Sequence, residues 1–162
     1  MIYYLIASIL IAVAALFART KRAVLAAGIL FYAVQIAAAG LLLWGGLYDT
    51  TSAAFFTFDA LGTLFYLLLV VVSMYVFGHS EAYLQGEDLR SYRLYFALLM
   101  LLTTAIAGAY FANNLAVTWI FLEATTLCSA GIIYHRRTAQ ALEAAWKYVF
   151  VCSTGIAMAY LG

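Results

Sequence analysis

Six long apolar stretches, joined by short connections that hold most of the charged residues, constrain this chain more than any other feature. A helix needs about 20 apolar residues to cross a bilayer. The stretches that approach or exceed this length are 2–18, 23–47, 60–78, 94–110, 115–134 and 139–161. A small water-soluble core cannot bury so much apolar surface. We therefore predict an all-α fold, a polytopic transmembrane helix bundle of about six spans that forms a single unit over residues 1–162.

The basic residues predict how this bundle is oriented in the membrane. Seven of the eight fall in or beside the first, third and fifth connections: Arg19, Lys21, Arg22, Arg90, Arg93, Arg136 and Arg137. Cytoplasmic loops carry an excess of lysine and arginine. We therefore expect the connections 19–22, 79–93 and 135–138 to be cytoplasmic, with the N-terminus outside. The acidic residues Asp49 and Asp59 then mark an outer connection. The first apolar run lacks a basic leader and a convincing cleavage site, so we interpret it as a retained helix.

The connection at 79–93 is polar, with charges of both signs and a turn signal at Gly86. We expect a solvated cytoplasmic loop, and the alternative is a docking surface for a soluble partner. His79 and His135 lie at the cytoplasmic ends of expected helices. Histidine changes its charge near neutral pH, so each is either simply solvated or a group that takes up protons.

The composition argues against several kinds of chemistry. Cys128 and Cys152 each lie inside an apolar run and form no CxxC pair. Two thiols alone cannot hold an iron–sulfur cluster or a zinc ion, so we expect buried packing residues. We expect no metal or cofactor site, and redox chemistry would belong to another subunit. A net charge of +1 provides no strong field for nucleic acid.

Glu123 lies near the middle of the fifth apolar stretch. A charge at the centre of a bilayer costs roughly 2.5–3.5 kcal/mol on insertion scales. Such a residue normally faces the bundle interior or a water-filled cavity. Burial disfavours an ionised carboxylate and a nearby ammonium favours it, so a movable partner can switch its protonation. We predict that Glu123 loads and releases a proton, and the alternative is a structural ion pair.

Lys147 is the candidate ammonium, about two turns into the sixth stretch. Glu143 precedes it by four residues, which is the favourable order for a helical ion pair. One hypothesis is therefore a local pair of Glu143 and Lys147. The other, which we prefer, places Lys147 in a polar line through the membrane that continues from Glu123. Hydroxyl groups accompany these residues and are either part of this line or bonded to helical carbonyls: Thr125, Thr126, Ser129, Ser153 and Thr154.

The C-terminal third resembles a known family. The segments NNLAVTWIFLEATTLCSA (113–130) and LEAAWKYVFVCSTGIA (142–157) are similar to antiporter-like membrane subunits. These occur in respiratory complex I, multisubunit cation/proton antiporters and membrane-bound group 4 hydrogenases. The amino-acid sequence of these segments is most similar to hydrogenase-4 component F, and the sequence FDAL at 58–61 also resembles the family pattern. The resemblance is specific over 113–162, looser over 55–112, and before that rests on hydrophobicity alone.

The resemblance implies roles for two residues. Glu123 matches the family's proton-channel glutamate in helix five, and Lys147 matches its lysine in helix six. The family has about fourteen helices, and its helix-seven lysine has no counterpart in residues 1–162. We therefore expect the chain to be the N-terminal part of a larger subunit.

The resemblance also implies a setting and partners. We expect a proton-translocating subunit in a bacterial or archaeal cytoplasmic membrane. Its partners would be the lipid bilayer, other membrane subunits and a peripheral redox arm with nickel–iron or iron–sulfur centres, without nucleic acid. The alternatives are a subunit of a multisubunit cation/proton antiporter and a structural membrane scaffold.

Overall fold

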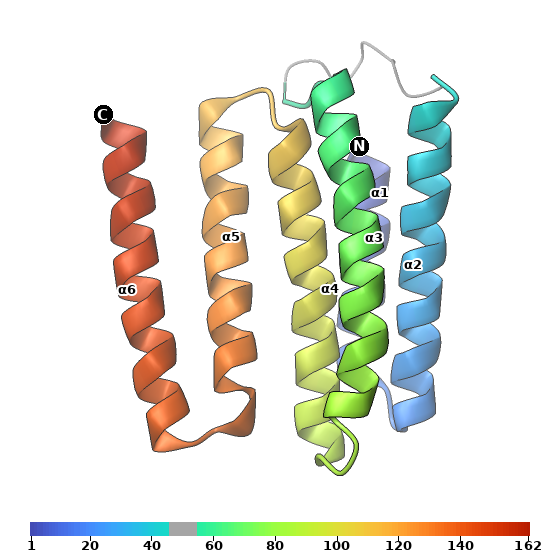
Figure 1. Cartoon of the computed structure of the whole chain (residues 1–162), viewed down its shortest axis with the longest axis vertical. Coiled ribbons are helices and arrows are strands. Elements are labelled where there is room, and N and C mark those ends of the chain that lie inside the picture. The colour runs from blue at the N-terminus through green and yellow to red at the C-terminus, as the bar shows by residue number, and fades with distance from the viewer. Residues whose placement is uncertain (46–54) are drawn as a thin grey trace.

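The computed structural model describes residues 1–45 and 55–162, and within them the regular elements are helices, apart from an isolated antiparallel bridge between Phe56 and Ala112 (Figure 1). Six α-helices and one short 3₁₀ helix follow one another: α1 (Ile2–Phe17), α2 (Lys21–Leu43), α3 (Ala60–Tyr83), α4 (Leu89–Phe111), α5 (Leu115–Ile133), η2 (Tyr134–Arg136) and α6 (Ala139–Leu161). The all-α prediction is confirmed.

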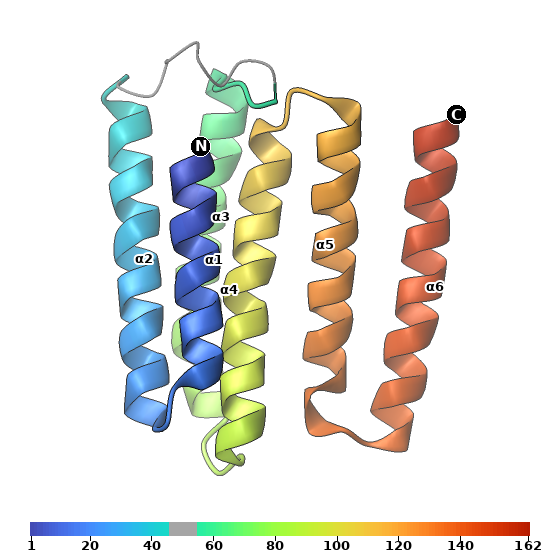
Figure 2. The same cartoon turned by 180° about the vertical axis from the view of Figure 1, so that it is seen from behind.

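The helices run up and down in alternation and form two parts. α1 to α4 pack as a bundle in which α1 contacts both α2 and α4. α5 lies against α4, and α6 lies against α5, so these two extend the bundle sideways as a row (Figures 1 and 2). The N- and C-termini lie at the same end. The connections with the basic residues lie together at the opposite end.

Polar caps fix where four of the helices begin. The side chains of Thr20, Asp59, Asn114 and Thr138 each accept a hydrogen bond from a backbone N–H in the first turn of the following helix. These bonds satisfy donors that have no partner within the helix. Because the caps are readable in the sequence, these helix starts are among the most precisely predictable features of the chain.

The third connection is much shorter than the sequence indicates. α3 continues to Tyr83 and α4 already begins at Leu89, so the expected loop at 79–93 shrinks to 84–88. Helix formation depends on backbone hydrogen bonds, which do not stop where a helix becomes polar. The turn predicted at Gly86 is confirmed, since this glycine has φ +105°. The end of the second expected helix, residues 46–47, and Asp49 lie outside the described residues.

Close contacts through glycine hold α5 against α4. A Cβ at Gly108 of α4 would lie 2.4 Å from the ring of Phe121 on α5, and one at Gly131 of α5 would lie 2.7 Å from Leu98 on α4. Each helix thus inserts a large side chain where its neighbour has none. This is the close approach that small residues permit in membrane helices.

Length sets α1 apart from the other helices. α2, α3, α4, α5 with η2, and α6 are each long and apolar enough to cross a membrane. α1 has 16 residues, so it rises only about 24 Å against a hydrocarbon core of about 30 Å. Large apolar side chains are exposed along α1, α2, α3, α5 and α6, as expected for surfaces in contact with lipid or other apolar partners, whereas α4 is mostly buried and exposes Tyr110 alone among its large apolar side chains.

Candidate functional site

Glu123 lies near the middle of α5 and faces α6. One carboxylate oxygen, Oε1, accepts a hydrogen bond from the Ser153 hydroxyl of α6. The other oxygen, Oε2, is buried and has no hydrogen-bond partner among the described residues. The sequence-predicted carboxylate is therefore held between two membrane helices by one bond, with one oxygen unused.

The threonines beside Glu123 serve their own helix. Thr125 and Thr126 both donate to the carbonyl oxygen of Leu122, at 2.7 and 3.2 Å. This is the local bonding that the sequence analysis kept as an alternative. In this arrangement neither hydroxyl extends a polar line from Glu123.

Lys147 and Glu143 form the local ion pair on α6. Their side chains are 62% and 60% exposed, so the pair lies on a face of α6 that the described helices leave uncovered. Ala145 is the buried residue of this helix. The pair occurs at the spacing that the sequence indicates, and neither member contacts α5 through a hydrogen bond.

The structure does not bring Glu123 and Lys147 together. No hydrogen bond or ion pair links them within residues 1–45 and 55–162. Ser153, the partner of Glu123, lies six residues after Lys147 on α6, which is about 9 Å along the axis and about 240° around it. The carboxylate and the ammonium are thus separated both in depth and in direction, and the predicted line through both is not continuous in this arrangement.

The two histidines lie in different environments. His79 is exposed and its ring stacks on Tyr75, with centroids 6.3 Å apart. His135 is only 7% exposed, and its ring lies 5.4 Å from the ring of Tyr95 and 6.2 Å from that of Tyr83. The expectation of a solvated side chain therefore fits His79 and is wrong for His135.

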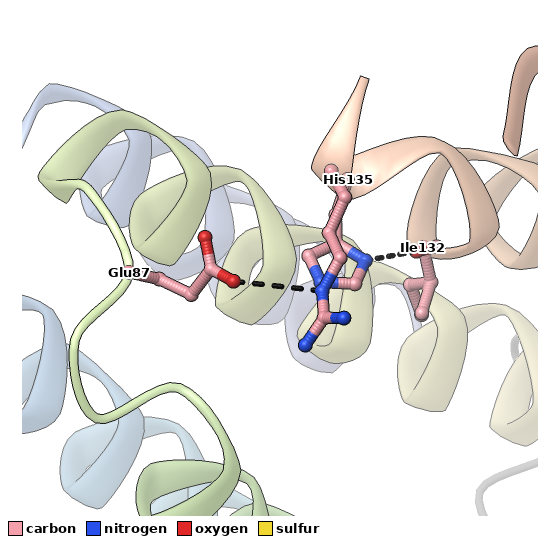
Figure 3. A network of polar contacts seen from close by, with 4 residues as sticks. Glu87, Ile132 and His135 are labelled. Atoms are coloured by element: carbon pink, nitrogen blue, oxygen red, sulfur yellow. Dashed lines mark hydrogen bonds and ion pairs between the residues drawn. The ribbon is translucent and has the colours of Figure 1, made fainter. Parts of the chain in front are cut away.

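One tautomer of His135 fits its surroundings. Nδ1 lies 2.8 Å from the carbonyl oxygen of Ile132, which can only accept, so Nδ1 carries a hydrogen (Figure 3). Nε2 is buried without a hydrogen-bond partner among the described residues. A neutral ring would leave an unused acceptor there, and a protonated ring would leave an unused donor.

Glu87 connects the three basic connections, a role that the sequence analysis did not foresee. Its carboxylate lies 3.5 Å from Nε of Arg136, beyond α5 (Figure 3). Its backbone oxygen accepts a 2.8 Å hydrogen bond from Nζ of Lys21, at the start of α2. In addition, Arg93 donates to the carbonyl oxygen of Ala18, at 3.1 Å. Noncovalent contacts therefore join the three connections at the charged end of the bundle. Part of the polar stretch at 79–93 makes these intramolecular contacts.

A buried polar group in α2 was also missed. Gln35 is fully buried, and its Oε1 accepts hydrogen bonds from Tyr4 of α1 and Tyr66 of α3, at 2.6 and 2.8 Å. An amide inside a long apolar stretch was the available signal, because such a group needs partners when it is buried.

The two cysteines do not form part of a metal-binding site among the described residues. Cys128 and Cys152 are free thiols and partly buried. Across the part of the chain that the structure describes, no cluster of three or more His, Cys, Asp or Glu side chains is placed to hold a metal ion.

Comparison with known proteins agrees with the sequence resemblance. No protein-family model matches the chain, and no solved structure matches it. The chain is similar to the hydrogenase-4 component F homolog of Methylacidiphilum infernorum (isolate V4), with 30% identity over 115 residues. The match covers 67% of this chain and 24% of that protein, so the chain spans about a quarter of its relative's length. The chain is a distant homologue of hydrogenase-4 component F, in the family of antiporter-like membrane subunits.

Proposed function

We propose that this chain is a proton-translocating, antiporter-like membrane subunit of a hydrogenase-like or complex I-like assembly, with Glu123 as the group that binds and releases the proton. The observation that carries the proposal is the setting of Glu123, a carboxylate in the middle of a membrane helix. It has one hydrogen-bonded oxygen and one buried oxygen without a described partner. An intramembrane carboxylate is expensive, and proton pathways are a common reason for its presence.

Ser153 suits a carboxyl group that changes protonation state. A hydroxyl group can both donate and accept a hydrogen bond. It donates to Oε1 when Glu123 is ionised, and it still donates to Oε1 when the proton is bound at Oε2, because Oε1 is then a carbonyl oxygen. The contact between α5 and α6 therefore persists through the cycle. The unused Oε2 is the atom at which a proton arrives or departs.

The ion pair of Glu143 and Lys147 is the second charged element of the proposal. It lies on the uncovered face of α6, where another helix of the assembly would contact it. Exchange of Lys147 between Glu143 and an acidic group on that helix would change the electrostatic potential near Glu123. At the basic end, His135 is a candidate for proton uptake because its buried Nε2 has no hydrogen-bond partner among the described residues, and exposed His79 is the second candidate.

The partners and location follow from the same proposal. Other membrane subunits and a peripheral redox arm with nickel–iron or iron–sulfur centres would supply the energy, in a bacterial or archaeal cytoplasmic membrane. The relative is described as a hydrogenase component homolog, which favours such an arm over a cation/proton antiporter that works without redox partners.

The test is Glu123→Gln in the intact assembly, reconstituted into vesicles. Glutamine keeps the size and hydrogen-bonding capacity of glutamate but cannot titrate. We expect proton translocation to fall by an order of magnitude or more, while the amount of assembled protein is unchanged. Thr125→Val is the matched control, since this hydroxyl bonds only to its own helix. Translocation at the normal rate by Glu123→Gln would reduce Glu123 to a structural residue and overturn the proposal.

A further inference from the structure

Four polar side chains meet inside the bundle of α1 to α4, in a part of the molecule that the proposed proton site does not use. Tyr4 and Ser8 lie one turn apart on the same face of α1. Gln35 comes from α2 and Tyr66 from α3. Ser8 and Gln35 are fully buried, and Tyr66 is 1% exposed.

The amide of Gln35 is only half satisfied. Its Oε1 accepts from both tyrosine hydroxyls, while its Nε2, which carries two hydrogens, has no partner among the described residues. Exchanging the oxygen and nitrogen of the amide does not remove the problem. The nitrogen would then donate to the tyrosines and the oxygen would lack a donor. Either assignment leaves half of a fully buried amide unpaired.

A second orphan group lies in the same region. The hydroxyl oxygen of Ser8 is buried and lies near the Tyr4 hydroxyl, but it makes no hydrogen bond of normal length in the described part of the chain. It lies one turn along α1 from Tyr4, which is itself bonded to Gln35. Two unsatisfied polar groups so near each other are rare in folded proteins, where buried polar atoms are bonded to protein or to ordered water.

A cavity adjoins this cluster. Its volume is about 40 Å³, and its mostly apolar wall includes Tyr4 and Tyr66 together with Met1, Ala38, Leu42 and Phe111, while Gln35 and Ser8 lie behind the two tyrosines and not in the wall. One water molecule needs roughly 10–15 Å³ by the same kind of measure, so the space is sufficient for two or three. The presence of Met1 in the wall places the cavity at the end of the bundle where the chain starts.

We propose that the Tyr4–Ser8–Gln35–Tyr66 cluster is a binding site for internal water. The bound water accepts a hydrogen bond from Gln35 Nε2, bonds to Ser8 or a tyrosine hydroxyl, and exchanges through the adjoining cavity. The ligand is neutral and small, because the site contains no ionised side chain and the cavity admits only a few non-hydrogen atoms. This hydrated site lies in α1 to α3, apart from Glu123 and Ser153.

The test is hydroxyl-radical footprinting of the intact assembly in its membrane. X-ray radiolysis generates radicals from water, including internal water, and mass spectrometry measures the oxidation rate of each tyrosine. Tyr32 is the internal control, a buried tyrosine of α2 whose hydroxyl donates to a backbone carbonyl at 2.8 Å. Tyr32 is 6% exposed and Tyr66 1%, so bulk solvent alone would oxidise Tyr32 faster. We expect the reverse, with Tyr66 oxidised several-fold faster.

A pair of variants tests the cavity as the route of exchange. Ala38→Leu places extra carbon atoms in the cavity, whereas Ala37→Leu adds the same atoms on the exposed face of α2. We expect Ala38→Leu to lower the oxidation of Tyr66 several-fold and Ala37→Leu to leave it unchanged. Oxidation of Tyr66 no faster than that of Tyr32 in the unmodified protein would overturn the proposal. That comparison decides even if a variant fails to fold.

Discussion

The ammonium of Lys147 pairs with the carboxylate of Glu143 one turn earlier on α6, on a face that no other described helix covers. Each charge of the pair is neutralised by the other. Without its partner, either charge would face an apolar environment on this side of α6. A face of this kind suits a polar partner more than lipid, because lipid offers no hydrogen bonds. The pair therefore marks the side of α6 on which we expect the rest of the assembly.

The first prediction separates a local from a functional role of Lys147. Lys147→Met should reduce proton translocation strongly, and the double change Glu143→Gln with Lys147→Met should reduce it to a similar level. If the two residues only neutralise each other, removal of both leaves no charge unpaired and activity returns. Initial rates of translocation in vesicles measure the difference, and full activity of the double variant would exclude Lys147 from the proton path.

The second prediction concerns the hydroxyl that holds Glu123. Ser153→Ala removes a hydrogen bond to a carboxylate, a kind of interaction worth about 1.5–3 kcal/mol. We expect slower translocation and a changed pH profile, because a hydrogen bond donated to a carboxylate favours the charged form over the neutral acid. Ser153→Thr keeps the hydroxyl and should restore both. A packing role alone would leave the pH profile of Ser153→Ala unchanged, so that profile is the deciding measurement.

The third prediction fixes the orientation, which stays a prediction from the basic residues. In a background with Cys128 and Cys152 replaced by serine, single cysteines are placed at Thr57 and Gln85, both exposed and at opposite ends of the bundle. A membrane-impermeant thiol reagent applied from outside should label position 57 and leave position 85 unlabelled. If only position 85 is labelled, the protein has the opposite orientation and the prediction is wrong.

The fourth prediction tests the contact between α4 and α5. Gly108→Leu forces carbon atoms into the ring of Phe121 and should destabilise the fold by about 1–3 kcal/mol, the usual cost of overpacking. Gly78→Leu is the control, since a Cβ there meets nothing within 4 Å. Thermal unfolding in detergent compares the two. Equal unfolding temperatures would show that α5 is free to move away from α4.

The sequence predicts the helices well because lipid imposes a simple rule on them. In lipid, the backbone N–H and C=O groups of an apolar run must form hydrogen bonds with one another, and a helix allows this. Capping residues such as Asn114 and Thr138 set where the helix begins. The boundary between α3 and α4 was misplaced because Ser80, although polar, is buried in α3, where its hydroxyl lies 3.1 Å from that of Tyr95. Hydropathy does not register such a contact between two helices.

The candidate site also contains features that the sequence predicts and features that it does not. Glu123 and Lys147 stand out as charges within apolar stretches, and the pairing of Lys147 with Glu143 follows from their spacing. Which way each side chain faces depends on the rotation of α5 and α6 about their axes, and tertiary packing sets that rotation. The sequence alone therefore does not predict the pairing of Glu123 with Ser153 or the link from Glu87 to Arg136.

The position of α1 between α2 and α4 has a consequence for biogenesis. Chains are synthesised and inserted N-terminal first, so α1 enters the membrane before the helix that covers one of its flanks exists. Its fully buried residues Ser8, Ala12 and Ala15 must then face lipid or the translocation machinery until α4 arrives. α5 and α6, in contrast, each meet a neighbour already in place. A defect in α4 would therefore leave these residues of α1 uncovered, although the contacts of α1 with α2 and of α2 with α3 could still form.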